Sequence, residues 1–460
     1  MMLFWAVLLG LLASPSKAMI APTSVVFNGP SSVFLAEDFG MTQHGVMRVS
    51  VSVTPAPALN PSSTSSKLTL SEFSARYPVY SSRQMGGYMM VIVMKDEQKN
   101  DWYRTIPTED VNAMSQLCTQ PSIYRHRLEF NALGQANFTY RISETMIHAD
   151  SQYSLALLQC YSLTLADVAL AVSANAEMWN AQPGNTAAKS YLGIEDVLKI
   201  RVLEGDMLIA SLFLTILVAQ IVLSMKPWYV LKLHILFLLS ISLGLALMAV
   251  TYAELKNRNT TGIESAENEM VVSVVDHFNT TTLLACFLLL SLGWCTTRIN
   301  LPTKEIRLIA GSIMLYFIIG MANAVCMDDS NQCASLNLVT YIIKNLLLLG
   351  IIIAMNFTVT QLRAGLMHSP WIPSTPVQYA RVKQFQMFRI VFILYLLLPT
   401  AFLLVQQSLF TWREDWLVFL LDEVLTLYMY FHVGSTFSPL QEPFLIRAFD
   451  NTFTDAVRGQ

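Results

Sequence analysis

The chain has 460 residues, of which 53% are hydrophobic and only 13% are charged, whereas soluble globular proteins carry about 25% charged residues. The formal net charge of −3 provides no basic face for nucleic acid, so that class of partner is excluded. The deficit of charged residues lies after residue 200, and the first 200 residues have an ordinary composition. This predicts a membrane-embedded part that follows an N-terminal domain outside the membrane.

Residues 1–18 have the pattern of a secretory signal peptide. The apolar run from Leu3 to Leu12 is too short to cross a bilayer core about 30 Å thick. Small residues at Ser16 and Ala18 predict cleavage after Ala18. An uncleaved anchor is the alternative, because the segment lacks a positively charged start.

Residues 19–205 are predicted to form an all-β sandwich in the lumen of the secretory pathway. Apolar and polar residues alternate with a period of two, as in Met47–Val53, which is typical of half-buried strands. Turns rich in Pro, Ser, Gly and Asn separate the strands, as expected for a sandwich. The other predicted strands are Tyr88–Met94, Arg127–Phe130, Phe138–Ile142, Tyr153–Cys160 and Val168–Asn180.

Seven long apolar runs follow within residues 206–437, each close to the roughly 20 residues that cross a bilayer as a helix. A soluble core does not need seven such runs in succession, so they predict a seven-transmembrane α-helical bundle, followed by a short tail at residues 438–460. The runs are Met207–Met225, Tyr229–Tyr252, Thr281–Ile299, Leu308–Val325, Leu336–Phe357, Phe388–Leu409 and Trp416–Phe437.

The charges of the loops predict the orientation of the bundle. Lys and Arg gather in the loops after the first, third and fifth helices, for example at Lys304 and Arg381, and the remaining loops are acidic. Because Lys and Arg favour the cytosolic side, the N-terminal domain is expected in the lumen and the tail in the cytosol.

Three glycosylation sequons agree with this orientation. We expect modification of Asn137, on the β domain, and of Asn259, in an acidic lumenal loop. Asn279 fits the same motif in the same loop, but it lies close to the membrane.

The cysteines fall into groups according to compartment. Cys118 and Cys160 lie in the β domain, where the lumen is oxidising, and are expected to pair. Cys326 and Cys333 flank a polar loop and could close a second bridge if that loop is lumenal. Cys286 lies within an apolar run and is expected to be a packing residue.

Ionisable residues within the predicted helices raise a functional question, because they are costly in hydrocarbon. Lys344 lies about 12 Å from the lumenal end of the fifth helix, at 1.5 Å per residue, and Asp422 and Glu423 lie at a similar depth in the seventh. We expect Lys344 to pair with Glu423 or Asp422 across a polar cavity; the alternative is an ion pair that only fixes helix packing. Two intramembrane histidines, His234 and His432, are too few for a catalytic zinc site, so no metal or cofactor is expected.

Several short motifs occur along the chain in a characteristic order and spacing. The motifs are Phe39–Gly45, Tyr153–Cys160, Glu177–Asn180 with Tyr191 and Leu192, Gly293 and Trp294, and a last-helix pattern of Trp416, Glu423, Tyr430, Gly434, Phe437 and Pro439. Together they resemble the lung seven-transmembrane receptor family, part of the GOST group of seven-helix proteins with a lumenal GOLD-like domain. Ser438 stands where the family carries Arg.

The resemblance implies a non-catalytic membrane protein of the Golgi or trans-Golgi that acts in trafficking, with an endosome or the plasma membrane as the alternative location. A lumenal ligand or cargo protein, membrane lipid, and trafficking machinery or a G protein in the cytosol are the implied partners. A G-protein-coupled receptor and an ion channel or transporter are the alternative functions. Gly293 and Trp294 are expected to form a close helix contact.

Overall fold

The computed structural model divides into two compact units. The β unit comprises Ser14–Leu198 with Leu255–Glu264, and the helical unit includes Lys199–Glu254 and Ser265–Gln460. The predicted signal peptide, Cys118, Cys160 and the tail with Pro439 lie outside the described residues. The structure describes residues 20–27, 31–57, 89–99, 122, 124–131, 133–142, 150–159, 168–182, 185–223, 228–263, 266–294, 301–326, 331–368, 375–409 and 411–437.

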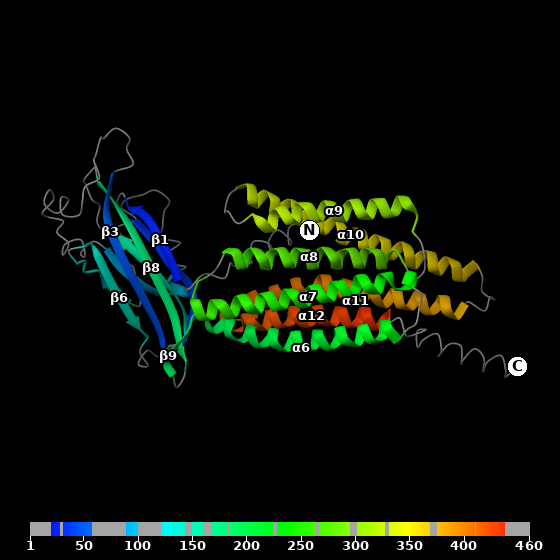
Figure 1. Cartoon of the computed structure of the whole chain (residues 1–460), viewed down its shortest axis with the longest axis horizontal. Helices are drawn as coiled ribbons and strands as arrows, with labels where there is room; N and C mark the ends of the chain where they lie inside the picture. The colour runs from blue at the N-terminus through cyan, green and yellow to red at the C-terminus, as the bar shows by residue number, and fades with distance from the viewer. Residues whose placement is uncertain are drawn as a thin grey trace. The chain divides into compact units, whose positions relative to one another are not determined.

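The β unit contains two antiparallel sheets. One sheet has the strand order β1-β8-β3-β6, with β9 paired to β8 (Figure 1). The other sheet has the order β2-β7-β4-β5. The strands are β1 Ile20–Phe27, β2 Ser31–Met41, β3 Gly45–Pro57, β4 Met89–Lys95, β5 Tyr124–Arg127, β6 Gln135–Arg141, β7 Ser151–Gln159, β8 Val168–Gln182 and β9 Asn185–Ser190.

One hydrophobic core joins the two sheets and confirms the predicted sandwich. Met47, Val49 and Val51 of β3 are buried in it together with Val91 of β4 and Leu155 of β7. The alternation in β3 therefore reports a strand with one face on the core, as the period of two predicts. Burial of these apolar faces supplies the main driving force for packing one sheet on the other.

The strands lie where the sequence patterns predict them, except that one predicted strand is displaced and three further strands were not predicted. β5 ends at Arg127, where the predicted strand begins, yet Leu128 and Phe130 are buried in the core. The backbone N–H of Leu128 still donates to the carbonyl oxygen of Met89 of β4 at 3.0 Å, so the segment continues along the sheet just beyond β5. β1, β2 and β9 were not predicted as strands.

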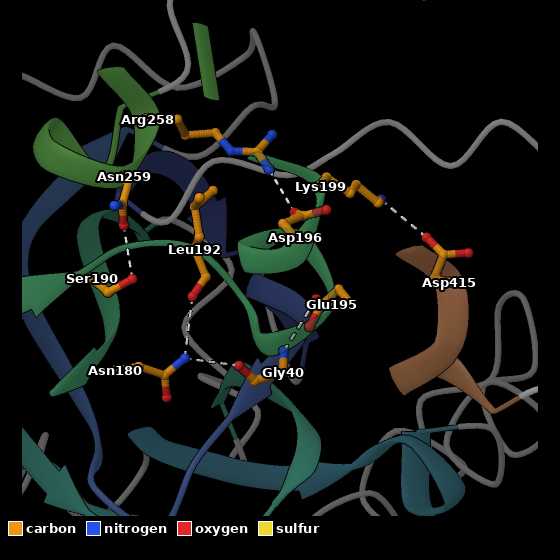
Figure 2. A network of polar contacts seen from close by, with 10 residues as sticks. All are labelled: Gly40, Asn180, Ser190, Leu192, Glu195, Asp196, Lys199, Arg258, Asn259 and Asp415. Atoms are coloured by element: carbon orange, nitrogen blue, oxygen red, sulfur yellow. Dashed lines mark hydrogen bonds and ion pairs between the residues drawn. The ribbon is translucent and has the colours of Figure 1, made fainter. Parts of the chain in front are cut away.

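Asn180, at the end of β8, holds three backbone segments of the β unit together. Its Nδ2 donates to the carbonyl oxygens of Gly40 (3.0 Å) and Leu192 (3.2 Å), as Figure 2 shows. Its Oδ1 accepts from the backbone N–H of Thr42 at 2.8 Å. The side chain is only 7% exposed, so these bonds replace water at groups that would otherwise be buried without partners.

A buried ion pair lies in the same unit. The guanidinium of Arg258, near the end of α7, contacts the Asp196 carboxylate in the first turn of α6 at 2.6 Å, and Arg258 is 1% exposed. Beside it, the Ser190 hydroxyl donates to Oδ1 of Asn259 at 2.8 Å (Figure 2). Asn259 of the predicted sequon is therefore half-buried at the end of a helix and engaged through its amide oxygen.

Among the described residues, seven helices are long and apolar enough to cross a membrane. Each extends beyond its predicted apolar run at one end or both, because helices continue where polar residues leave the hydrocarbon. The helices are α6 Ile194–Leu223, α7 Trp228–Thr261, α8 Ala266–Ser291, α9 Thr303–Val325, α10 Asn331–His368, α11 Thr375–Leu409 and α12 Asp415–Thr436, the last preceded by the short 3-10 helix η2 Trp412–Glu414.

The largest difference from the predicted helices concerns α8. The apolar run suggested a start at Thr281, but the helix begins at Ala266, because the polar residues of this segment lower its average hydropathy without breaking the helix. Asn279 therefore lies within a membrane-spanning helix, where the Tyr430 hydroxyl donates to its Oδ1 at 3.5 Å. Its placement in a lumenal loop was wrong.

The end of α8 also differs from the prediction. The helix stops at Ser291, and Gly293 adopts a left-handed conformation with φ 75°. The N–H groups of Gly293 and Trp294 donate to the carbonyls of Leu290 and Leu289, which is the Schellman pattern of a helix C-terminus. The Gly-Trp motif thus ends a helix, and Trp294 packs against the buried core of the bundle. The close helix contact at this motif stays a prediction.

We expect Asn180→Ala to lower the free energy of unfolding of the β unit by about 2–4 kcal/mol, because it leaves several buried backbone groups without partners. The measurement is urea-dependent proteolysis of the purified full-length protein. Asn175→Ala is the matched control, since Asn175 lies on the same strand with an exposed side chain. Equal stability of the two variants would contradict the assigned role of Asn180.

Candidate functional site

The helical unit contains a cavity of about 450 Å³ that is lined by residues of α8, α9 and α10. Each of these three helices packs on the other two, and they lie side by side in Figure 1. The cavity lies near the start of α8, the end of α9 and the start of α10. Its volume falls within the range of about 300–1,000 Å³ that is typical of small-molecule sites.

The α8 wall is polar along its length. Glu269, Ser273, Asp276 and Thr280 follow one another at intervals of four, three and four residues, which places them on one face of a helix. The sequence analysis missed this wall because it assigned these residues to a loop. The i, i+4, i+7 spacing of the polar residues is the signal that could have found it.

The other two walls show the same spacing. From α9, Tyr316, Gly320 and Asn323 line the cavity, and from α10 the side chains of Asn337, Thr340, Tyr341 and Lys344 do so. Apolar residues on the remaining faces of α9 and α10, such as Leu308, Ile318 and Leu346, are exposed. The three helices therefore turn their polar stripes toward one another and their apolar residues outward.

Three charged side chains share the cavity. Glu269 and Asp276 are exposed and Lys344 is half-buried. The ammonium of Lys344 acts electrostatically on Asp276 but forms no ion pair within 4.0 Å with any described residue. The site thus offers a positive group and two negative groups that do not neutralise one another by direct contact.

Lys344 does not form the expected ion pair with the seventh helix. It lies within electrostatic range of Asp422, yet neither Asp422 nor Glu423 lines the cavity. The charged neighbours of Glu423 are carboxylates, among them Asp206 of α6, a buried residue that the sequence analysis did not single out. The correction follows from α8: because that helix begins early, it places Asp276 close to Lys344.

His277 forms the boundary between the cavity and the packed bundle. The residue is 8% exposed, and its ring packs at a tilt against Tyr316 with 4.9 Å between ring centroids. Its Nε2 lies 3.2 Å from the carbonyl oxygen of Phe317. A Cβ atom at Gly320 would lie 1.8 Å from the ring, so only glycine leaves space for it. His277 is a third histidine within the membrane-spanning helices, beyond the two predicted ones.

A disulfide bridge closes one end of the cavity. Cys326, which lines the cavity, is bonded to Cys333 near the start of α10, with 5.7 Å between their Cα atoms. The bridge fixes the connection between α9 and α10 at the point where both contribute lining residues. Cys286 is buried in the bundle core, as expected for a packing residue.

The last-helix motif residues serve packing. Tyr430 and Gly434 of α12 are buried, and a Cβ at Gly434 would lie 2.6 Å from the Phe213 ring of α6. Phe437 packs on Phe388, and its carbonyl oxygen lies 2.7 Å from Nε2 of His234. Trp416, near the start of α12, is half-buried. Over the described part of the chain, no three His, Cys, Asp or Glu side chains are placed to hold a metal ion.

We expect Gly320→Ala to destabilise the helical unit by about 1–3 kcal/mol, since the added methyl group overpacks the His277 ring. The measurement is the thermal unfolding midpoint of the purified protein in detergent. Gly311→Ala on the same helix is the matched control, because a Cβ there meets no atom within 4 Å.

Removal of the His277 ring tests whether the ring causes the destabilisation. In a His277→Ala background, Gly320→Ala should lower the unfolding midpoint less than it does in the native protein. If Gly320→Ala costs the same stability with and without His277, the contact does not explain the glycine.

Comparison with known proteins gives one match. The family model described as GOST, seven transmembrane domain, matches residues 202–444, which is more than half of the chain and runs from within α6 to beyond α12. It describes a seven-transmembrane domain. No curated protein matches the chain. The motifs, the seven membrane helices and this match agree: the chain belongs to the GOST family of seven-transmembrane proteins.

Proposed function

We propose that this protein is a non-catalytic receptor of the secretory pathway that resides in the Golgi or trans-Golgi membrane and binds a lumenal ligand or cargo. The observation that carries the proposal is the cavity among α8, α9 and α10. Its ammonium, carboxylate, amide and hydroxyl groups can recognise charged and polar groups of a ligand.

The proposed orientation places the cavity toward the lumen. The charges of the loops favour a lumenal N-terminus. In that orientation α8 and α10 begin, and α9 ends, on the lumenal side, which is where Glu269, Asn323 and Asn337 line the cavity. The Cys326–Cys333 bridge would then lie in the oxidising compartment, where disulfides persist.

The β unit supplies a second surface for a partner. Asn137, on β6, is exposed, so its sequon is accessible to a lumenal glycosyltransferase. A sandwich of this kind presents loops and sheet edges, and such segments carry binding functions on a rigid scaffold.

We expect the full-length tagged protein to colocalise with a trans-Golgi marker and to migrate faster in electrophoresis after treatment with an N-glycosidase. The shift should be smaller for Asn137→Gln, because that variant loses an exposed acceptor. Steady-state residence at the cell surface, or insensitivity of the native protein to the glycosidase, contradicts the proposed location and orientation.

We also expect deletion of the gene to change which proteins the cell secretes, as measured by quantitative mass spectrometry of the medium. The native chain should restore the normal pattern, and Lys344→Met and Asp276→Asn should not, because each removes a charge from the cavity. Lys304→Met is the matched control, since Lys304 is an exposed residue in the first turn of α9 and does not line the cavity. An unchanged secretome after deletion would refute a trafficking role.

A further inference from the structure

We propose that the cavity among α8, α9 and α10 binds a small solute that carries two ammonium groups and one carboxylate, which is the chemistry of a basic amino acid. The inference goes beyond the proposed function, because binding to the purified protein does not depend on location or on a role in trafficking.

The charges of the cavity select the charge of the solute. Lys344 is outnumbered by Glu269 and Asp276, so the lining has an excess of one negative charge. A solute of net charge +1 neutralises this excess, and an anion increases it. Opposite charges attract and like charges repel, so a cationic solute is favoured over an anionic one.

The positions of the charges select the arrangement of groups on the solute. Lys344 approaches from α10 and Asp276 from α8, so the two walls can hold a carboxylate and an ammonium of one molecule. Glu269 lies two helical turns from Asp276, about 10 Å along α8 at 1.5 Å per residue. A second ammonium at the far end of a flexible chain could therefore reach Glu269.

Neutral groups between the charges complete the site. Thr340 and Tyr341 lie one turn before Lys344 on α10, and Ser273 lies one turn before Asp276 on α8. The hydroxyls of Ser273 and Tyr341 can donate to a carboxylate or accept from an ammonium. The Thr340 hydroxyl donates to the carbonyl oxygen of Leu336 at 2.9 Å, so it can accept from an ammonium. The cavity of about 450 Å³ has room for such a solute together with bridging water.

The test measures binding of L-lysine, cadaverine and L-glutamate to the purified full-length protein at pH 7. Cadaverine is L-lysine without its carboxylate. Nanodiscs of phosphatidylcholine alone exclude competition by lipid head groups that carry a primary amine. We expect L-lysine to bind about tenfold or more tightly than cadaverine, because a charge-assisted contact contributes at least that factor, and L-glutamate to bind more weakly than both.

Variants of the cavity residues show which side chain binds which charged group of the ligand. Lys344→Met should weaken L-lysine to the level of cadaverine without weakening cadaverine, since only the carboxylate has lost its partner. Asp276→Asn should weaken both ligands, and the control Lys304→Met neither. Absence of saturable L-lysine binding to the native protein, L-glutamate binding as tightly as L-lysine, or equal L-lysine affinity of a folded Lys344→Met variant would each overturn the proposal. If Lys344→Met does not fold, the ranking of the three ligands on the native protein decides.

Discussion

Hydrocarbon does not solvate polar side chains, and this constraint accounts for the arrangement of α8, α9 and α10. Each helix carries polar residues at intervals of three and four, such as Asp276, Asn323 and Lys344, together with an apolar remainder. A polar stripe on one helix can be kept from lipid only if its neighbours cover it. The three stripes face one another, and the space between them becomes a cavity with charged walls.

Close packing at small residues defines the limits of that cavity. Gly320 leaves space for the ring of His277, which separates the cavity from the bundle core near Tyr316. Gly434 likewise leaves space for the ring of Phe213 in another part of the bundle. Packed interiors hold few voids, and polar groups that line one need water or a ligand to satisfy their hydrogen bonds. This is why the charged groups of the cavity, rather than its size alone, indicate a binding site.

Hydrogen bonding explains why two distant motifs occur together in the β unit. Asn180 ends the Glu177–Asn180 motif, and its amide bonds backbone groups of Gly40 and Thr42 in the Phe39–Gly45 motif. The same amide reaches Leu192, just before α6 begins. One buried side chain thus bonds backbone groups at a turn, at a strand end and before the start of a helix, so loss of the Asn180 amide would leave polar groups in all three unpaired.

The sequence by itself determined the class of fold: the alternation at Met47–Val53 gave a strand on a core, and seven apolar runs gave a membrane bundle. It did not place Asp276 or His277, because average hydropathy reports contact with lipid and fails for a helix such as α8, whose first half carries many polar residues. Lys344 was found from the sequence but its expected pair with Glu423 was not formed, since depth along two helices does not say which helices are neighbours. Only the tertiary structure decided that α8 and α10 pack together and bring Asp276 near Lys344, because contacts between residues far apart in the chain depend on how every helix packs at once.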